Sequence, residues 1–148
     1  MRTHVIFLFL LISTIMQAQK ALSIEDDPYF ECLKLHLKSL KDQKVLNDTV
    51  YVQQKDYLKD FTGRVNNVII VMVDGKFIKE HTKRGKSLWV ISINPVVFNE
   101  KNSSITIIDF GVSRRRDRYK MINNGGIKIR MEYDCDDGKY RYEVVASH

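Results

Sequence analysis

The sequence predicts an α+β fold in which an N-terminal helix packs on a curved, mainly antiparallel sheet. The first observation is an early stripe of apolar residues at helical spacing, formed by Phe30, Leu33, Leu37 and Leu40. The second is that β-prone stretches separated by turn residues follow this helix. The third is the alternation of apolar and polar residues on both sides of Asp137-Gly138, which is typical of a β-hairpin.

The first 18 residues are typical of a secretory signal peptide. Arg2 provides a positive charge, an apolar run covers residues 5–16, and Ala18 is a small residue at the expected cleavage point. The run is shorter than the roughly 20 residues that cross a bilayer, which argues against a membrane anchor. We therefore expect a secreted or periplasmic protein with residues 1–18 removed, residues 19–27 as a mobile leader and residues 28–148 as a single α+β domain.

The composition is that of an ordinary globular domain. Of the 148 residues, 44% are hydrophobic and 28% are charged, which argues against disorder. The formal net charge of +6 is modestly basic, so it favours solubility and does not identify a partner. No second long apolar run occurs, and we expect no membrane span after removal of the signal peptide.

The predicted fold begins with a helix over residues 28–44. Asp27 is a good N-cap, and Pro28 suits the first helical position. A short strand is expected at 49–53, and residues 55–63 have the spacing of a short helix.

Strands account for most of the remaining chain. The β-branched run 65–73 predicts a buried strand, and Asp74-Gly75 predicts a hairpin turn into a second strand at 76–80. Residues 87–98 predict the next strand, with a bend at Pro95, because proline cannot donate a hydrogen bond to a ladder.

The last third of the chain predicts a strand at 104–113, a polar connection at 114–125 and a terminal hairpin. The alternation in the first strand changes phase at Ile107-Ile108, which predicts either a bulge or burial on both faces of the strand. A two-residue hairpin turn would pair Tyr133 with Tyr142, and Cys135 with Tyr140. The same register leaves Glu132 opposite Glu143 as its one unfavourable pair.

Sequential strands usually pair, so the late strands are expected to form a meander that curls around the helix. This layout is similar to that of cystatin-like or NTF2-like cones. The similarity is one of topology alone, because no motif in the chain supports either family, and a fold does not define a function.

The motifs of common enzyme classes are missing from the sequence. No serine lies in a Gly-x-Ser-x-Gly turn. His36 follows Cys32 by four residues, so the two can meet on one helix face, but no oxyanion-binding feature accompanies them. The histidines lack metal-ligand spacing, and the carboxylates in 134–138 suit a turn better than a calcium loop. We therefore expect no metal, no cofactor and no assigned catalytic residue.

Aromatic side chains on the predicted sheet are candidates for an apolar ligand pocket. A curved sheet on a helix leaves a concavity, and an inward Asp109 would add a carboxylate able to act as an acid or a base. The alternative is that these side chains fill the core. The candidate ligand-binding residues are Trp89, Asp109, Phe110, Tyr133, Tyr140 and Tyr142.

A concentrated run of positive charge indicates an anion-binding surface, with a second basic loop at 79–86 that could converge on it. The alternative is an exposed connection kept soluble by its charge. Export argues against nucleic acid as the partner. The candidate anion-binding residues are Arg114, Arg115, Arg116, Arg118 and Lys120.

Cys32 and Cys135 are candidates for a disulfide, because an exported chain with two cysteines can form one. Two free cysteines are the alternative.

The function that these observations favour is a small exported, non-catalytic binding protein of unknown ligand. Two alternatives stay open: a small enzyme without motifs that uses a carboxylate in a cone-shaped pocket, and a structural or inhibitor-like protein that binds through an exposed sheet edge.

Overall fold

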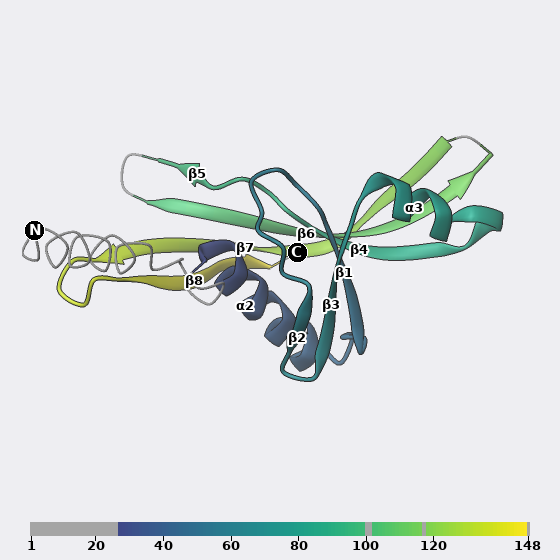
Figure 1. Cartoon of the computed structure of the whole chain (residues 1–148). Helices are drawn as coiled ribbons and strands as arrows, with labels where there is room; N and C mark the ends of the chain where they lie inside the picture. The colour runs from purple at the N-terminus through teal and green to yellow at the C-terminus, as the bar shows by residue number, and fades with distance from the viewer. Residues whose placement is uncertain (1–26, 100–101, 117, 148) are drawn as a thin grey trace, which may run out of the picture.

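The computed structural model describes residues 27–99, 102–116 and 118–147, and the predicted signal peptide and all of the leader except Asp27 lie outside this range. The described residues form two α-helices and one eight-stranded sheet, which confirms the α+β class and the mainly antiparallel sheet. The sheet is mixed and remains open (Figure 1). The analogy with cystatin-like and NTF2-like cones is therefore not confirmed.

The strands are β1 Thr49–Gln53, β2 Gly63–Val65, β3 Val68–Val73, β4 Ser87–Ile93, β5 Val97–Phe98, β6 Ser103–Arg115, β7 Arg118–Asp134 and β8 Lys139–Ser147. Their order across the sheet is β2–β3–β1–β4–β6–β7–β8, and β5 pairs with β6. β1 is parallel to both of its neighbours, β3 and β4, whereas the other pairs are antiparallel. The expected meander is thus present in β4, β6, β7 and β8, while the chain between β3 and β4 crosses over β1.

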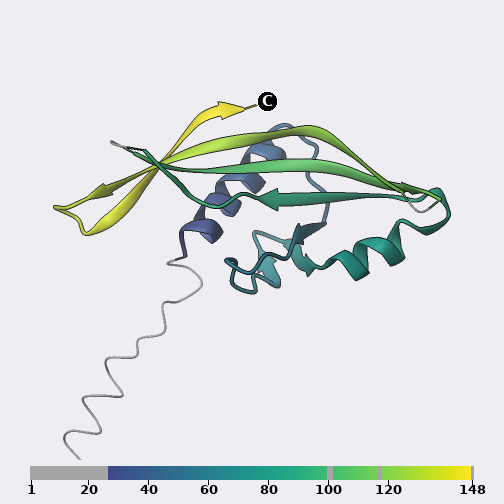
Figure 2. The ribbon, with the colours of Figure 1, turned by 90° about the horizontal axis from the view of Figure 1, so that it is seen from above.

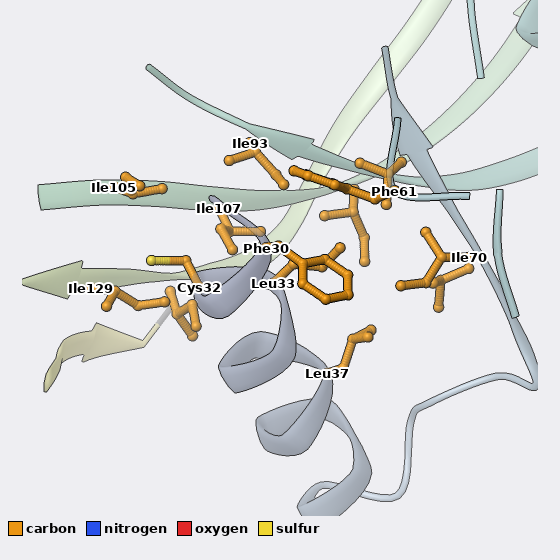
Figure 3. Close-up of a cluster of buried hydrophobic side chains, with 14 of the residues drawn as sticks. Phe30, Cys32, Leu33, Leu37, Phe61, Ile70, Ile93, Ile105, Ile107 and Ile129 are labelled. Carbon is orange, nitrogen blue, oxygen red and sulfur yellow. The ribbon is translucent and has the colours of Figure 1, made fainter. Parts of the chain in front are cut away.

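The first helix, α2, spans Pro28–Asp42 and confirms the predicted N-terminal helix. Its start is capped by Asp27, whose Oδ1 accepts hydrogen bonds from the backbone N–H groups of Tyr29 (2.9 Å) and Phe30 (3.4 Å). The helix lies against the concave face of the sheet (Figure 2). Burial of one leucine or isoleucine side chain contributes about 1.5–3 kcal/mol. The core between α2 and the sheet includes Cys32, Leu33, Leu37, Ile70, Ile93, Ile105, Ile107 and Ile129 (Figure 3).

The second helix, α3 (Gly75–His81), replaces the strand predicted at 76–80. Asp74 is an N-cap rather than a hairpin residue, because its Oδ1 accepts a hydrogen bond from the N–H of Phe77 at 2.7 Å. An Asp-Gly pair suits either role, and the need to cover the sheet face opposite α2 favours the helix here. The residues buried on that face are Val73, Ile78, Val90 and Val112.

Other predictions for the middle of the chain are wrong in detail. Residues 55–62 hold turns and irregular structure instead of a short helix. The strand predicted at 65–73 is divided by Asn66-Asn67, whose φ angles of 47° and 70° suit a tight hairpin between β2 and β3. The strand predicted at 87–98 is interrupted at Pro95, as expected, because β4 ends before it and β5 begins after it.

The stretch 114–125, predicted as a polar connection, belongs to two long paired strands. β6 and β7 form a hairpin whose distal arm extends past the helix (Figure 2). Polar residues are tolerated there because an antiparallel arm outside the core can be solvated. The bulge predicted at Ile107-Ile108 of this strand is wrong, because β6 pairs with β4 without a break from Ile107 to Ser113. The β6–β7 register instead shifts between Asp109 and Phe110, and the extra residue is Asn124 of β7.

The terminal hairpin is confirmed, but its register differs by two residues from the predicted one. Tyr133 pairs with Tyr140, and Met131 pairs with Tyr142, so the loop covers four residues, 135–138. A shift of two residues keeps each side chain on its predicted face. The larger loop is favoured locally because Asp134 Oδ1 accepts a hydrogen bond from the N–H of Asp136 at 2.9 Å.

This register also removes the unfavourable pair of the predicted one. Glu143 lies opposite Arg130 instead of Glu132, and its Oε2 is 3.2 Å from Arg130 Nη1. Opposite charges at facing positions of two antiparallel strands are stabilising, whereas like charges are destabilising.

Cys32 and Cys135 are both free thiols, so the predicted disulfide is not observed. Cys32 is fully buried on the inner face of α2, whereas Cys135 is exposed in the β7–β8 loop. The last buried residue of β7 is Met131, and the strand continues beyond it into an exposed arm. The arm therefore carries Cys135 away from the core in which Cys32 lies.

Candidate functional site

A pocket of about 350 Å³ lies between the C-terminal half of α2 and the concave face of β4, β6 and β7. Its walls come from segments that are far apart in the sequence. This volume suits a small molecule rather than a polymer. The polar residues that line it are His36, Ser39, Gln43, Trp89, Asp109 and Asn124, and the others are Leu40, Val45, Gly125, Gly126 and Ile127.

A buried histidine–carboxylate pair forms one wall of this pocket. His36 Nε2 lies 2.9 Å from Asp109 Oδ1, and only 1% and 4% of the two residues is exposed. His36 faces inward because it lies three residues after Leu33 and four before Leu40 on the buried stripe of α2. Asp109 faces the same interior because it follows buried Ile107 by two residues on β6.

The hydrogen bond fixes the orientation of the His36 ring. When Nε2–H donates to an ionised Asp109 carboxylate, a neutral ring presents Nδ1 as a lone-pair acceptor. A protonated ring presents Nδ1–H as a donor in the same place. The pair can therefore bind a polar group, or take up and return a proton, at Nδ1.

Two nitrogen atoms of pocket residues have no hydrogen-bond partner within the described parts of the chain. These are His36 Nδ1 and Trp89 Nε1, and both atoms are shielded from solvent. A buried polar group without a partner costs about 1–3 kcal/mol. Such groups in a native fold call for a partner, and a bound polar molecule would supply one.

The β6–β7 bulge shapes the opposite wall. The register shift at Asp109 leaves Asn124 as an extra residue between two paired positions of β7. The amide of Asn124 lies over Gly111, since a Cβ at Gly111 would be 3.0 Å from Asn124 Nδ2. Trp89 pairs with Gly111 across β4 and β6, so the indole and the amide lie on the two strands that flank β6.

Of the six predicted ligand-binding residues, the structure brings two into this pocket, Trp89 and Asp109. Phe110 points to the opposite face, where it packs with the cluster beneath α3. Tyr133 and Tyr140 are 56% and 49% exposed, and their rings meet edge to face, 5.2 Å apart, on the β7–β8 arm. The single aromatic concavity predicted from the sequence is thus not present.

Tyr142, the sixth predicted residue, is half-buried against the main core. Burial and the nearby Cys32 raise the pKa of the Tyr142 phenol to about 12. Burial, together with the charges of Glu31 and Asp27, raises the pKa of the Cys32 thiol to about 12. Cys32 therefore stays a protonated thiol at neutral pH, which is not the state of a catalytic nucleophile.

His36 and Asn124 are two of the pocket residues that the sequence did not identify as site residues. The signal for His36 was present, because it occupies an inward position on the same stripe as Leu33 and Leu40. Asn124 could not be identified, since its place depends on where the register shifts.

The predicted anion-binding residues gather at the distal end of the β6–β7 hairpin. A hollow there is bordered by Arg115, Arg116, Arg118, Tyr119 and Lys120. The one-turn helix η2 (Lys83–Gly85) lies beside β6, and Ser87 pairs with Ser113. The second basic loop therefore meets the first at this end of the sheet (Figure 2).

No family model, curated protein or solved structure matches this chain. Among the described residues, no helix combines the length and apolar character needed to cross a bilayer. No group of three or more histidine, cysteine, aspartate or glutamate residues that could hold a metal ion occurs in 27–99, 102–116 and 118–147. The function is therefore argued from the pocket itself.

Proposed function

We propose that this protein binds a small polar molecule in the pocket of His36, Asp109 and Trp89. The observation that carries the proposal is the presence of two buried nitrogen atoms without partners, His36 Nδ1 and Trp89 Nε1, on the wall of one pocket. An oxygen atom of the ligand would accept a hydrogen bond from the indole N–H. A donor group of the ligand would pair with Nδ1 of a neutral His36 ring, so the ligand would offset the cost of two desolvated polar groups.

The polarity of the pocket supports binding over simple core packing. The walls combine apolar side chains with a few convergent polar groups, which is the usual composition of a small-molecule site. Cavities that stay empty in a protein interior are lined by apolar side chains, whereas several side chains of this pocket are polar. We further propose that this binding protein is exported and that its mature chain begins after Ala18.

Trp89 offers a direct test, because it is the one tryptophan of the 148 residues. A library of small polar molecules would be screened by Trp89 emission and by thermal melting. Ligands of this pocket should change the emission and raise the melting temperature, since they bind the folded state alone. His36→Gln and Asn124→Leu should each weaken the binding of the same compounds.

Lys128→Gln is the matched control, because Lys128 is exposed on β7 outside the pocket. It should leave both readouts unchanged. If the same compounds bind His36→Gln and Asn124→Leu as tightly as they bind the natural chain, the site does not lie in this pocket.

A second candidate function, acid–base catalysis, is favoured by the His36–Asp109 hydrogen bond of 2.9 Å. A carboxylate that orients an imidazole prepares the second ring nitrogen to accept a proton from a substrate. The reaction class would be proton transfer next to a carbonyl group, as in an isomerisation or a dehydration. The protein would then be the small enzyme with a carboxylate in its pocket.

Hydrogen exchange separates the two functions. Pocket ligands that carry an acidic C–H next to a carbonyl would be incubated with the protein in D₂O and followed by NMR. Catalysis predicts deuterium uptake that is lost in both His36→Gln and Asp109→Asn. If the ligands bind but the protein does not speed their deuterium uptake, acid–base catalysis is excluded and the binding function remains.

A further inference from the structure

We propose that the pocket is one end of a longer ligand track, and that its ligand is an elongated amphipathic acid whose acidic group lies at Lys120. The inference rests on the proposed function and adds the chemical class of the ligand. It joins two surfaces that are separate in the sequence, the His36–Asp109 pocket and the basic distal arm of the β6–β7 hairpin.

The strand register places the two surfaces on the same face. Side chains two residues apart on a strand share a face, and paired residues on neighbouring strands share it too. Starting from the row that contains Asp109, the next row outward on the concave face holds Trp89, Gly111 and Ile122. The following row holds Ser87, Ser113 and Lys120, and the last row holds Arg115 and Arg118.

These rows give the track a length. Successive rows on one face are about 6.6 Å apart, at about 3.3 Å per residue. Lys120 therefore lies about 13 Å from the Asp109 row, and Arg118 lies one row further out. A molecule that reaches from the pocket to Lys120 would be longer than the pocket alone can hold.

The outer part of the track is open within the described residues. α2 ends at Asp42, and its last turns line the pocket rather than the rows beyond it. α3 packs on the opposite face, so it does not cover the track. Ile122 is 47% exposed, and Ser87, Lys120 and the two outer arginines are also exposed.

The charges set the direction of the ligand. The Asp109 carboxylate at the inner end disfavours a second anion beside it, whereas Lys120, Arg115 and Arg118 attract one at the outer end. Between the two ends, Trp89 and Ile122 present apolar surface. The matching ligand has an uncharged hydrogen-bonding end, an apolar middle and an acidic end.

12-Hydroxydodecanoate and 1,12-dodecanediol are suitable probes, because they share the apolar chain and the uncharged hydroxyl end and differ in the acidic group. Both would be titrated into the full protein while Trp89 emission is followed. The hydroxy acid should bind more tightly than the diol, and its advantage should shrink as salt is added, because exposed charges are screened.

Lys120→Gln should weaken binding of the hydroxy acid by roughly two- to fivefold, the usual range for one exposed ion pair, and should leave binding of the diol unchanged. Lys128→Gln is the matched control. Lys128 is an exposed lysine of the same strand, and it pairs with Thr106 on the other face of the sheet.

The track is overturned, and the pocket proposal still stands, if the hydroxy acid and the diol bind equally well. The same holds if the hydroxy acid binds Lys120→Gln as tightly as it binds the natural chain. If neither probe changes Trp89 emission, the track is also overturned, and the separate screen of small polar molecules decides the pocket. Lys120-dependent retention on heparin without binding of the hydroxy acid would overturn the track and assign the arm to a polyanion instead.

Discussion

His36 and Asp109 are separated by 73 positions in the chain, yet they share a buried hydrogen bond of 2.9 Å. The bond ties the middle of α2 to β6 at the position where the β6–β7 register shifts. Helix, sheet and pocket therefore meet at one pair of side chains. Removal of either partner would leave the other buried without its hydrogen bond, so the pair is tested first.

Asp109→Ala should lower the free energy of unfolding by about 1–3 kcal/mol, because His36 would lose its buried partner. Urea unfolding at neutral pH measures the change. A double-mutant cycle with His36→Ala should give a coupling energy of about 0.5–3 kcal/mol, the range for residues in contact. Asp56→Ala removes an exposed aspartate and should change stability by less than about 0.5 kcal/mol. A coupling energy of zero would contradict the pair.

Gly126→Ala should be strongly destabilising. A Cβ at Gly126 would overlap the carbonyl oxygen of Ile107 on the paired strand, and the φ of 154° is strained for any residue with a side chain. The cost should exceed the typical destabilisation of about 1 kcal/mol for a point mutation, and thermal melting measures it.

Gly75→Ala is the control for this glycine, since a Cβ there would meet no atom within 4 Å and the residue lies in a helix. It should be neutral or stabilising by up to about 1 kcal/mol. Equal melting temperatures for the two variants would refute the close approach of β6 and β7.

Thiol labelling of the native, unreduced protein should modify one cysteine quickly and the second only on unfolding. The fast one is Cys135, because it is exposed, and the slow one is Cys32, because it is fully buried. Mass spectrometry after a timed pulse of iodoacetamide identifies both sites. Two unreactive cysteines in the denatured, unreduced chain would instead establish the disulfide that the sequence permits.

Alkaline pH should destabilise the protein. Burial raises the pKa of Cys32 from 9.0 to about 12, so the folded state keeps a proton that the unfolded chain loses. The contribution to stability is complete below about pH 9 and is lost as the pH rises to about 12. Tyr142 adds to the loss above about pH 10, since its pKa is raised from 10.0 to about 12.

Urea unfolding at a series of pH values measures this loss. Cys32→Ala should make the decline shallower, whereas Cys135→Ala should leave it unchanged because that thiol is exposed. The explanation fails if the two variants show the same decline between about pH 9 and pH 12.

Local signals in the sequence were sufficient for the elements that one segment specifies alone. The apolar stripe from Phe30 to Leu40 and the cap at Asp27 predicted α2 almost to its last residue. The faces of β7 and β8 were predicted correctly as well, because alternation survives a register shift of two residues. Asp74-Gly75 was misassigned, since the same dipeptide caps a helix and turns a hairpin.

The pocket could be predicted only in part. Trp89 and Asp109 were identified as candidates because an aromatic and a carboxylate on predicted strands are common in ligand sites. Phe110 is absent from the pocket because it lies on the opposite face of the sheet, and Tyr133 and Tyr140 are absent because they lie on the exposed β7–β8 arm. Both facts depend on how distant segments pack, so the sequence did not predict them.

Composition and periodicity alone established the α+β class, the helix at α2 and the antiparallel hairpin at the C-terminal end, because these depend on spacing within a single segment. The parallel pairing of β1, the four-residue loop before β8 and the free thiols were decided by packing between distant segments. The meeting of His36 with Asp109 belongs to the second group. A hydrogen bond between a helix and a strand 73 residues away leaves no periodic trace in either, so only the folded chain reveals it.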